Sequence, residues 1–423
     1  MSINPRKLAV GILSEVLAEG AYNNIALREA FAKHKDLDNQ SKAFVTDVVN
    51  GTLRNLIHID HVIAQFAKGR TKPYVKQVLR LSVYQLFYTE NPSYAVVNEA
   101  TDLIKGSRFK ASAGFVNGIL RSIERNKDQV VYPKEKLAYL SVKYSFPLPL
   151  LTYFRTFLSE AEIEAFVTHS VTPPKVTICV NTLKTTCKAL ITALDKEGVI
   201  ATPSSTHPEA LILTKVSDVA NLSAYQAGLF HVMDPVSMSA VQTLDPAPGG
   251  VVYDLCAAPG GKTFYMGQRM KNQGKIVATD IHEHKVKLLR AGAQRLGLSL
   301  IEAQTADALK GDLPKKMADY VLLDAPCSGF GIIRKKPDIK YTKTLADVEA
   351  LAKIQRELLE VASDYTKPGG KLVYATCTLS VKENQENVAW FVANYPYQLI
   401  TEKQYTSSDQ DGFYTALLQR KYT

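Results

Sequence analysis

The 423-residue sequence lacks long hydrophobic runs and biased segments, and these absences exclude several classes of protein. No stretch approaches about 18 uninterrupted apolar residues, and the N-terminal segment MSINPRKLAV has no apolar signal core. We therefore expect neither membrane insertion nor secretion. No low-complexity tract or internal repeat occurs. Apolar residues make up 46% and charged residues 22% of the chain, a composition typical of a globular protein.

Cysteine is scarce, and its positions provide neither a disulfide framework nor a zinc site. The five cysteines form an odd set without a C-x-x-C pair and without histidines at zinc-finger spacing: Cys179, Cys187, Cys256, Cys327 and Cys377. We therefore expect reduced thiols in a cytoplasmic protein, and no bound metal.

Acidic residues are in deficit. Lys and Arg number 51 against 41 Asp and Glu, a net charge of +10. Residues 1–140 hold 20 of these basic residues and 13 of the acidic ones, so the first third of the chain carries most of the surplus. Its basic residues are spaced among Tyr and Phe at helical intervals. We expect a folded nucleic-acid-binding face here, the alternative being a solvated basic surface.

The length indicates two or three domains at roughly 150 residues each. Residues 1–140 predict an all-α domain, because apolar residues recur at intervals of three and four. These residues are Leu8, Ile12 and Val16, then Val75, Leu79, Val83 and Leu86, then Phe115, Ile119 and Ile123. Residues 145–245 predict a small α+β domain, with helices at 150–167 and 186–197 and strands at 175–180 and 210–214.

Residues 246–423 alternate apolar strand-like runs with helical segments. Strands are expected at 251–255, 275–279, 300–304, 320–323 and 371–375. A helix at 345–367 is expected to end at the turn Pro368-Gly369-Gly370. Strands joined by crossover helices predict a parallel, doubly wound, Rossmann-like α/β domain.

Reactive residues follow these strands, at the edge where such sheets bind ligands. The first strand leads into a glycine-rich loop made of Cys256, Ala257, Ala258, Pro259, Gly260, Gly261 and Lys262. The loop is not a P-loop, because Cys256 stands where the first glycine is needed, and no G-x-G-x-x-G occurs. Asp280 is placed to bind ribose hydroxyls, and Asp307 could reach the adjoining base. The pattern favours a nucleoside-containing cofactor without a pyrophosphate.

Two cysteines follow neighbouring strands and suggest nucleophilic chemistry. Cys377 precedes Ser380-Val381-Lys382-Glu383, an S-x-x-E pattern that predicts a helix start. A thiol near a helix N-terminus has a lowered pKa and a larger thiolate fraction. A lone cysteine is more often an inert buried residue. Here a second cysteine, Cys327, follows Asp324 at the end of a neighbouring strand, and the pair of cysteines favours a chemical role over an inert one.

Three motifs, in order, carry a resemblance to a known family: Asp254-Leu255-Cys256-Ala257-Ala258-Pro259-Gly260-Gly261-Lys262-Thr263, Asp324-Ala325-Pro326-Cys327-Ser328-Gly329 and Thr376-Cys377-Thr378. The chain resembles, over essentially its whole length, the Sun/Fmu (RsmB) family of bacterial 16S rRNA cytosine-C5 methyltransferases. Residues 1–140 resemble a NusB-type RNA-binding domain. Cys179 and Met233 depart from the family pattern, which has Arg and Gln there, and the missing Arg removes a phosphate contact.

The resemblance implies S-adenosylmethionine as cofactor, held by the 256–262 loop with Asp280 at the ribose and Asp307 near the adenine. It implies that Cys377 attacks C6 of a cytosine, so that C5 accepts the methyl group. Cys327 would assist release of the product. Asp324 would contact both the target base and the methionine end of the cofactor.

The RNA partner implied is the small-subunit rRNA. We expect a monomer, because no coiled-coil heptads or long apolar surface stripe stand out in the sequence. The cytosine must be single-stranded or flipped, since C6 is inaccessible in a stacked helix. Arg334, Lys335 and Lys336 resemble a family segment lining the substrate site, and they join Arg6 and Lys7 as candidate RNA contacts. Two alternatives remain: the same chemistry on tRNA or another RNA, and a non-catalytic NusB-like RNA-binding or assembly factor. A pure binder needs neither Cys327 nor Cys377.

Overall fold

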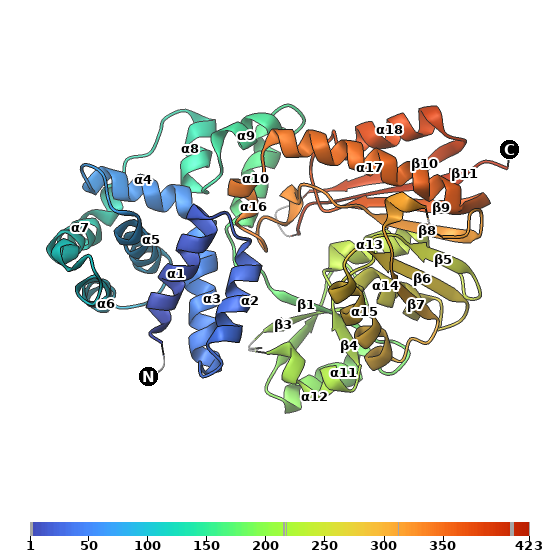
Figure 1. Ribbon diagram of the computed structural model, residues 1–423, viewed down its shortest axis with the longest axis horizontal. Coiled ribbons are helices and arrows are strands. Elements are labelled where there is room, and N and C mark those ends of the chain that lie inside the picture. Colours follow the sequence, from blue (N-terminus) through green and yellow to red (C-terminus); the bar gives the residue numbers. More distant parts are fainter. Residues whose placement is uncertain (1–2, 215, 217, 312, 407–409, 423) are drawn as a thin grey trace. The chain divides into compact units, whose positions relative to one another are not determined.

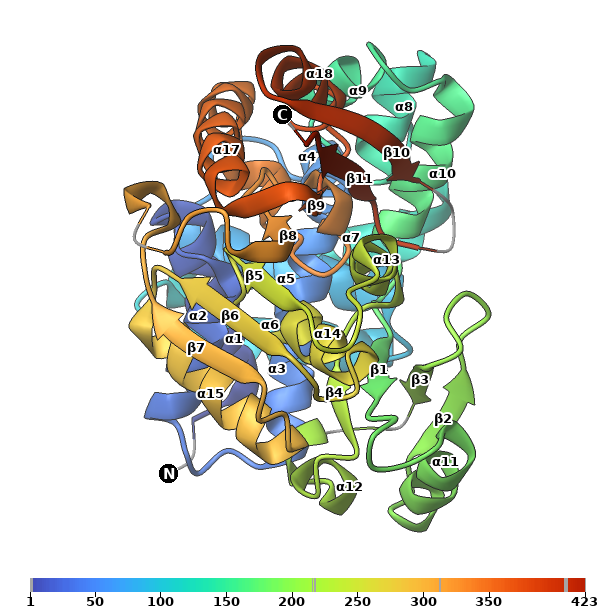
Figure 2. The same ribbon diagram turned by 90° about the vertical axis from the view of Figure 1, so that its right-hand side faces the viewer.

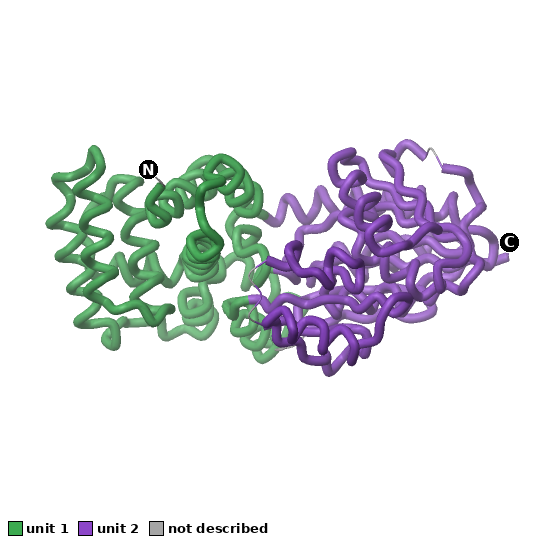
Figure 3. The backbone as a smooth tube through the Cα atoms, turned by 90° about the horizontal axis from the view of Figure 1, so that it is seen from below, with its two compact units in different colours: residues 1–173, 333–343 green, residues 174–332, 344–423 purple. Residues whose placement is uncertain are grey.

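The computed structural model describes residues 3–214, 216, 218–311, 313–406 and 410–422. The chain forms two compact units (Figure 3). Unit 1 comprises Met1–Pro173 and Ile333–Lys343, and unit 2 comprises Pro174–Ile332 and Thr344–Thr423. The three domains predicted from the sequence, 1–140, 145–245 and 246–423, follow a different division and stay a prediction. The structure adds that a segment soon after Cys327 belongs to unit 1.

Unit 1 is helical, with no strand among its described residues. The helices are α1 (Pro5–Ala18), α2 (Asn23–Lys33), α3 (Asn39–Arg54), α4 (Leu56–Phe66), α5 (Pro73–Tyr88), α6 (Ser93–Lys105), α7 (Ala113–Asn126), α8 (Lys136–Lys143), α9 (Leu148–Phe154), α10 (Glu160–Ser170) and α16 (Ile339–Thr342) (Figure 1). The all-α prediction for residues 1–140 is confirmed. The single helix predicted at 150–167 is wrong, because two helices, α9 and α10, occupy that region.

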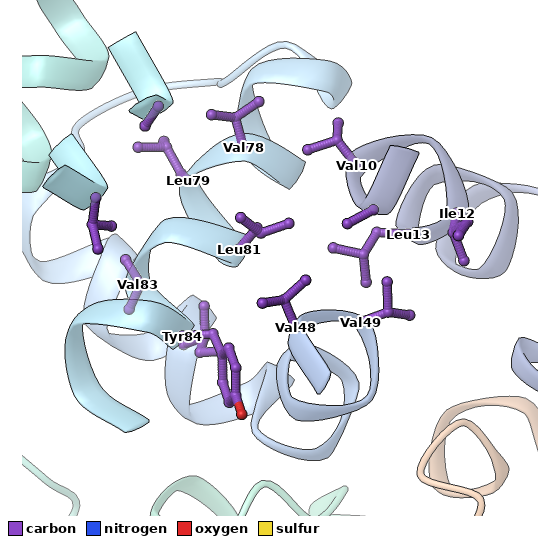
Figure 4. Packing of buried hydrophobic residues seen from close by; sticks show 14 of the residues in the cluster. Val10, Ile12, Leu13, Val48, Val49, Val78, Leu79, Leu81, Val83 and Tyr84 are labelled. Atoms are coloured by element: carbon purple, nitrogen blue, oxygen red, sulfur yellow. The ribbon is translucent and has the colours of Figure 1, made fainter. Parts of the chain in front are cut away.

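One apolar core holds the first seven helices of unit 1 together. Figure 4 shows side chains of α1, α3 and α5 meeting there, among them Leu13, Val48 and Leu81. The predicted core residues are buried with one exception, Phe115, which is 41% exposed. The buried stripe of α7 passes through Val116, one position on, so that Phe115 points to solvent.

Unit 2 contains two sheets. The smaller is antiparallel, in the order β2-β3-β1-β4, and carries α11 (Cys187–Lys196) and α12 (Ser223–Gln226). Its strands are β1 (Val176–Val180), β2 (Ile200–Pro203), β3 (Ala210–Thr214) and β4 (Phe230–Val232). The predicted strands at 175–180 and 210–214 and the helix at 186–197 are confirmed, while β2 and β4 are additional.

The larger sheet has seven strands in the order β10-β11-β9-β8-β5-β6-β7 (Figure 2). They are β5 (Val251–Asp254), β6 (Lys275–Asp280), β7 (Ile301–Thr305), β8 (Ala318–Asp324), β9 (Thr366–Thr376), β10 (Tyr397–Tyr405) and β11 (Phe413–Arg420). The five predicted strands, β5 to β9, are present and parallel. The expectation of a wholly parallel sheet is wrong, because the hairpin β10–β11 adds to β9 in antiparallel fashion.

Helices cover both faces of this sheet, because its central strands β5 and β6 are buried along almost their whole length. Val252 and Ile276 pack with α13 (Pro235–Leu244), α14 (Gly261–Arg269) and α15 (Glu283–Leu296). Tyr253 and Val277, each one position further on, pack into a second core with α17 (Leu345–Tyr365) and α18 (Gln385–Asn394). This confirms the Rossmann-like α/β class.

The prediction that the long helix of unit 2 ends at a turn formed by Pro368-Gly369-Gly370 is wrong. Helix α17 ends at Tyr365, and β9 begins at Thr366, so Pro368-Gly369-Gly370 lies within the strand. The register of β8 and β9 shifts between Ala318 and Tyr320, which takes up this irregular stretch. Among the described residues, no helix is both long and apolar enough to cross a membrane.

Candidate active site

The carboxyl ends of the parallel strands β5 to β9 hold the predicted cofactor and catalytic residues. Hydrogen bonds connect the loops that follow them. Ala257 N, after β5, donates to Thr279 O on β6 (2.8 Å). Lys262 Nζ donates to Asp324 Oδ2 at the end of β8 (2.6 Å). These residues therefore meet at one edge of the sheet, although the sequence places them on separate loops.

The loop after β5 turns sharply into α14. Gly260 has a φ of +110°, in the region that favours glycine, and a Cβ atom there would lie 2.5 Å from the Phe264 ring. Helix α14 starts at the next residue, Gly261. The 256–262 loop therefore includes the start of α14, where the first backbone N–H groups of a helix have no acceptor within the helix.

Asp254, the last residue of β5, is buried with a carboxylate that is only partly satisfied. Thr263 Oγ1 donates to Oδ2 (2.7 Å), whereas the buried Oδ1 has no hydrogen-bond partner among the described residues. Burial raises the pKa of Asp254 to about 7; the Asp324 charge adds to the rise, and the bond from Thr263 opposes it. Burial and these two carboxylates also raise the pKa of Cys256, which stays a thiol. Oδ1 is an acceptor suited to a cationic or hydrogen-bonding ligand.

Lys262 and Asp324 form an ion pair with little solvent exposure. Their side chains are 15% and 30% exposed. Burial acts to lower the pKa of Lys262, but the charge and hydrogen bond of Asp324 outweigh it, and the net pKa is raised. Lys262 also lies 5.4 Å from the centre of the Phe413 ring. The pair holds the Asp324 carboxylate in one orientation beside the 256–262 loop.

Asp280 and Asp307 lie at the ends of β6 and β7. Asp280 is buried, and its Oδ1 accepts a hydrogen bond from His282 N (3.0 Å). Its backbone oxygen accepts from Ala306 N (3.2 Å), which brings the neighbouring Asp307 to the same edge. Asp307 Oδ1 accepts from Leu309 N (3.1 Å). Each carboxylate has acceptor capacity beyond these bonds.

Cys327 and Cys377 are 50 positions apart in sequence, yet their Sγ atoms lie 3.3 Å apart. Gly331 N donates to Cys377 O (2.9 Å), which joins the loop after β8 to the loop after β9. The hydrogen bond with Cys377, and then burial, raises the pKa of Cys327 well above its ordinary value. Cys327 is therefore a thiol at neutral pH, able to donate to the Cys377 sulfur.

The prediction of a helix start at Ser380 is wrong. Helix α18 begins at Gln385, so Cys377 does not precede a helix directly. Glu383 N donates to Ser380 Oγ (3.3 Å), which is one half of a capping box. The Glu383 carboxylate does not complete the box, because it binds the backbone N–H of Ser328 (2.8 Å). The argument for a lowered Cys377 pKa from a helix N-terminus fails with it.

Sequence reasoning missed the polar residues that join the two cysteine loops. They are Ser328, Gln355, Thr378 and Glu383. The sequence indicated two of these residues, because Ser328 directly follows Cys327 and Thr378 directly follows Cys377. Gln355 on α17 and Glu383 carry no comparable signal, since only the fold brings them to these loops.

The five candidate RNA-binding residues lie in unit 1: Arg6, Lys7, Arg334, Lys335 and Lys336. Arg6 and Lys7 belong to the first turn of α1, where Arg6 lies 3.7 Å from Glu99. Lys336 is exposed, whereas Arg334 and Lys335 are partly buried. The backbone of this segment is anchored, because Arg54 Nη2 donates to Arg334 O (3.5 Å) and Asn23 N donates to Asp338 Oδ2 (3.3 Å).

The two departures from the family pattern lie in the interior of unit 2. Cys179 is 0% and Met233 is 5% exposed. Burial raises the pKa of Cys179 well above its ordinary value. Neither position is open to a phosphate, so these departures concern packing in the core.

Three family models match successive parts of the chain. Residues 3–125 match the NusB family, and residues 150–220 match the ferredoxin-like domain of RsmF/B-like methyltransferases. Residues 241–419 match the family described as 16S rRNA methyltransferase RsmB/F. The last match contains both cysteine loops and the 256–262 loop.

Relatives are similar over nearly their whole length. The probable ribosomal RNA small subunit methyltransferase B of Bacillus subtilis is 37% identical over 400 residues, covering 92% of this chain and 88% of the relative. The protein of the same description from Synechocystis is 31% identical, covering 98% and 96%. The crystal structure of PH0851 has a TM-score of 0.82 at 29% identity and covers 99% of this chain and 100% of that one. With these motifs, this geometry and these relatives, the chain belongs to the RsmB/F family of 16S rRNA methyltransferases.

Proposed function

We propose that this protein is an S-adenosylmethionine-dependent 16S rRNA (cytosine-C5)-methyltransferase. The observation that carries the proposal is the 3.3 Å separation of Cys327 Sγ and Cys377 Sγ beside the Lys262–Asp324 pair. A methyl transfer to a nitrogen, an oxygen or an already nucleophilic carbon needs no cysteine, whereas C5 of cytosine must first be activated by addition at C6. The names of the curated relatives support rRNA of the small subunit as the substrate.

The residues after β5, β6 and β7 fit a cationic, nucleoside-containing cofactor. The buried Asp254 Oδ1 is an acceptor without a partner among the described residues, and Gly260 keeps space where a Cβ would meet Phe264. The 256–262 loop would hold the methionine part, Asp280 would accept hydrogen bonds from the ribose hydroxyls, and Asp307 would lie near the adenine. When bound, S-adenosylmethionine supplies an electrophilic methyl group.

Cys377 acts as the nucleophile in this proposal. Its sulfur forms a bond to C6 of the cytosine, and the electron pair of the C5–C6 double bond moves to C5, which takes the methyl group. Asp324 binds the polar edge of the ring and is oriented by the 2.6 Å bond from Lys262. A carboxylate held in this way would contact the target base and the methionine end of the cofactor together.

Cys327 assists release of the methylated base. Once C5 carries the methyl group, a base accepts the C5 proton and the electron pair of that C–H bond re-forms the C5–C6 double bond. The bond between C6 and the Cys377 sulfur breaks, and the sulfur keeps its electron pair as a thiolate. Since the hydrogen bond with Cys377 and burial raise the pKa of Cys327, this residue can exchange a proton with the departing sulfur.

The basic side chains of unit 1 are proposed to hold the RNA. Lys7 lines a cavity of about 550 Å³ that also has Tyr74, Arg108 and Phe109 in its wall. Aromatic and cationic groups together suit unstacked bases and their phosphates. Lys336, which is exposed, and its neighbours Arg334 and Lys335 would add phosphate contacts.

The test is methyl transfer from radiolabelled S-adenosylmethionine to unmodified small-subunit rRNA, with large-subunit rRNA and tRNA as parallel substrates. The modified base is then mapped. We expect 5-methylcytosine in the small-subunit rRNA only. Transfer to tRNA instead would assign the alternative substrate. Transfer to no RNA, with intact RNA binding, would support the non-catalytic alternative.

The covalent step has its own test. We expect Cys327→Ala to accumulate a protein–RNA adduct that survives a denaturing gel and disappears in the double variant Cys327→Ala/Cys377→Ala. An active Cys327→Ala enzyme without an adduct would remove the release role from this residue.

A further inference from the structure

One buried carboxylate contacts both cysteine loops. Glu383 is 0% exposed. Its Oε1 accepts a hydrogen bond from Ser328 N (2.8 Å), and its Oε2 accepts one from Ser328 Oγ (2.6 Å). The Oε2 atom also lies 3.4 Å from Thr378 Oγ1. Ser328 directly follows Cys327, and Thr378 directly follows Cys377, so the contacts of Glu383 are one residue from each sulfur.

Helix α17 also contributes a side chain that contacts Glu383. Gln355 Nε2, from α17, donates both to Glu383 Oε1 (3.1 Å) and to Pro326 O (2.9 Å). The two hydroxyls, Ser328 Oγ and Thr378 Oγ1, lie 2.7 Å apart. The carboxylate therefore receives a backbone N–H, an amide N–H and hydroxyl groups. Both N–H donors point to Oε1, whereas Oε2 faces only the two hydroxyls. An ionised carboxylate makes charge-assisted hydrogen bonds to both cysteine loops, and a neutral glutamine would replace them with weaker ones.

Burial raises the pKa of Glu383, while the hydrogen bonds from Ser328, Gln355 and Thr378 act to lower it by favouring the charged form. An acidic side chain in a buried position needs such donors. Here Ser328 and Thr378 come from the two cysteine loops, and Gln355 comes from α17. No helix cap explains this carboxylate, since α18 begins at Gln385 with Asn384 as its N-cap residue.

We propose that Glu383 is a positioning residue that holds the Cys327 and Cys377 loops together and thereby sets the separation of the two sulfur atoms. Its hydrogen bonds reach Ser328 and Thr378, the residues that directly follow the two cysteines, and its charge adds to the rise in the pKa of Cys327. The consequence for methyl transfer rests on the proposed function, whereas the consequence for the sulfur separation does not.

Disulfide formation measures the sulfur separation without any substrate. A bond of about 2.05 Å needs only a small approach from 3.3 Å, so the two sulfurs should couple readily. The oxidant is diamide, an azo compound: the two thiols lose two protons and two electrons, which convert diamide to its hydrazine. The Cys327–Cys377 disulfide is quantified over time by mass spectrometry of peptides prepared without reductant.

We expect Glu383→Gln to slow this coupling at least tenfold, because a neutral amide holds the two loops less firmly than the carboxylate does. The matched control is Glu386→Gln, an exposed glutamate on α18, which should couple at the wild-type rate. In the methyl transfer assay, Glu383→Gln should lower kcat about 10- to 100-fold with KM values unchanged within twofold, as for a residue that orders reacting groups. Coupling of Glu383→Gln at the wild-type rate would overturn the proposal.

The combination with Ser328→Ala tests whether Glu383 acts through its partner. If it does, the double variant should couple no more than twofold more slowly than Glu383→Gln alone. Multiplicative effects of the two changes would contradict this. If Glu383→Gln does not fold, as judged by its melting transition, Ser328→Ala and Thr378→Val replace it. At least one of them must then slow the coupling threefold or more, and wild-type rates in both would overturn the proposal.

The two proposals can fail separately. A wild-type protein that methylates no RNA, but in which coupling depends on Glu383, would remove the proposed function and leave the positioning role. A protein that methylates rRNA, with coupling independent of Glu383, would do the reverse.

Discussion

The two units bury charges of opposite sign. The described part of unit 1 buries three cationic side chains and one carboxylate: Arg54, Arg80, Lys340 and Asp338. The described part of unit 2 buries four carboxylates and neither lysine nor arginine: Asp254, Asp280, Glu383 and Asp411. A buried charge needs a partner inside the protein or on a ligand. The partners of these buried groups therefore distinguish groups that only support the fold from groups that can bind a ligand.

The buried cations of unit 1 have internal partners. Arg80 binds Asp60 through Nε (2.7 Å), and Lys340 Nζ donates to Arg54 O (2.7 Å) and lies 4.8 Å from the centre of the Phe146 ring. These cations are buried within unit 1 and are not open to a phosphate. Arg54 and Arg80 belong to residues 1–140, so part of the charge surplus of that segment is not available to the proposed RNA partner. Exposed cations such as Lys7 are the relevant ones.

In unit 2 the buried acids divide into two kinds. Glu383 is fully supplied with donors by the protein, whereas Asp254 Oδ1 has none among the described residues. The first kind orders loops, and the second is suited to a ligand. Four substitutions test this contrast between the units.

The largest effect is expected from Cys377→Ala. Removing the proposed nucleophile should lower methyl transfer by at least about 10³-fold, because the neighbouring Cys327 is kept as a thiol by its raised pKa and is a poor substitute. RNA affinity, attributed to unit 1, should stay within twofold of the wild-type value. Radiolabel transfer and filter binding measure the two. Cys187→Ala, on α11, is the control and should be fully active; activity of Cys377→Ala above a tenth of wild type would contradict the assignment.

Asp254→Asn should weaken cofactor binding on the order of 10- to 100-fold by removing the buried charge. The wild-type carboxyl, with a pKa of about 7, is protonated below that pH, and a cation binds the ionised form better. Affinity should therefore rise with pH between 6 and 8, with release of a proton. Calorimetry in two buffers measures both quantities.

In Asp254→Asn this dependence should disappear. The control is Asp245→Asn, since Asp245 is mostly exposed and pairs with Arg269. Equal pH dependence in wild type and Asp254→Asn would show that another group titrates.

Lys336→Ala tests an exposed charge of unit 1 and should have a small effect. Loss of one phosphate contact should reduce the salt slope of rRNA affinity by about 0.7. Fluorescence anisotropy at several salt concentrations measures the slope. Lys287→Ala, exposed on α15 of unit 2, is the matched control and should leave the slope unchanged. If Lys287→Ala reduced the slope and Lys336→Ala did not, the phosphate contacts would be assigned to unit 2 instead of unit 1.

Lys340→Met tests a buried cation of unit 1, and its effect should be the smallest, confined to stability. Burial, and then the charge of Arg54, lowers the pKa of Lys340 in the folded protein. The unfolded chain then binds the proton more tightly, so stability falls as the pH decreases from the ordinary lysine value of about 10.4. Lys340→Met should flatten this decrease. Melting temperatures at pH 7 and 9.5 measure this pH dependence, and Lys336→Met is the exposed control. If Lys340→Met had the same pH dependence as the wild type, another group would be responsible for it.

The elements with strong local patterns are the ones that the sequence predicts. The strands β5 to β9 are apolar runs bounded by turns, and the helices of residues 1–140 have regular apolar stripes. Strand β10 has no such pattern, because it is an edge strand with mostly exposed residues, so the sequence does not predict the hairpin. The pattern at Ser380 to Glu383 is misleading, since the same letters suit a helix cap and the loop that holds Ser328.

Local periodicity predicts the strands that the reactive groups of the site follow, and so it predicts those groups and their order along the chain. Which of the groups meet depends on the packing of the folded chain. It brings Cys327 to Cys377 across 50 positions, carries Glu383 and Gln355 to the loops of both, and assigns Ile333–Lys343 to unit 1. These contacts depend on how strands and helices pack, and packing between distant segments leaves no periodic trace in the chain.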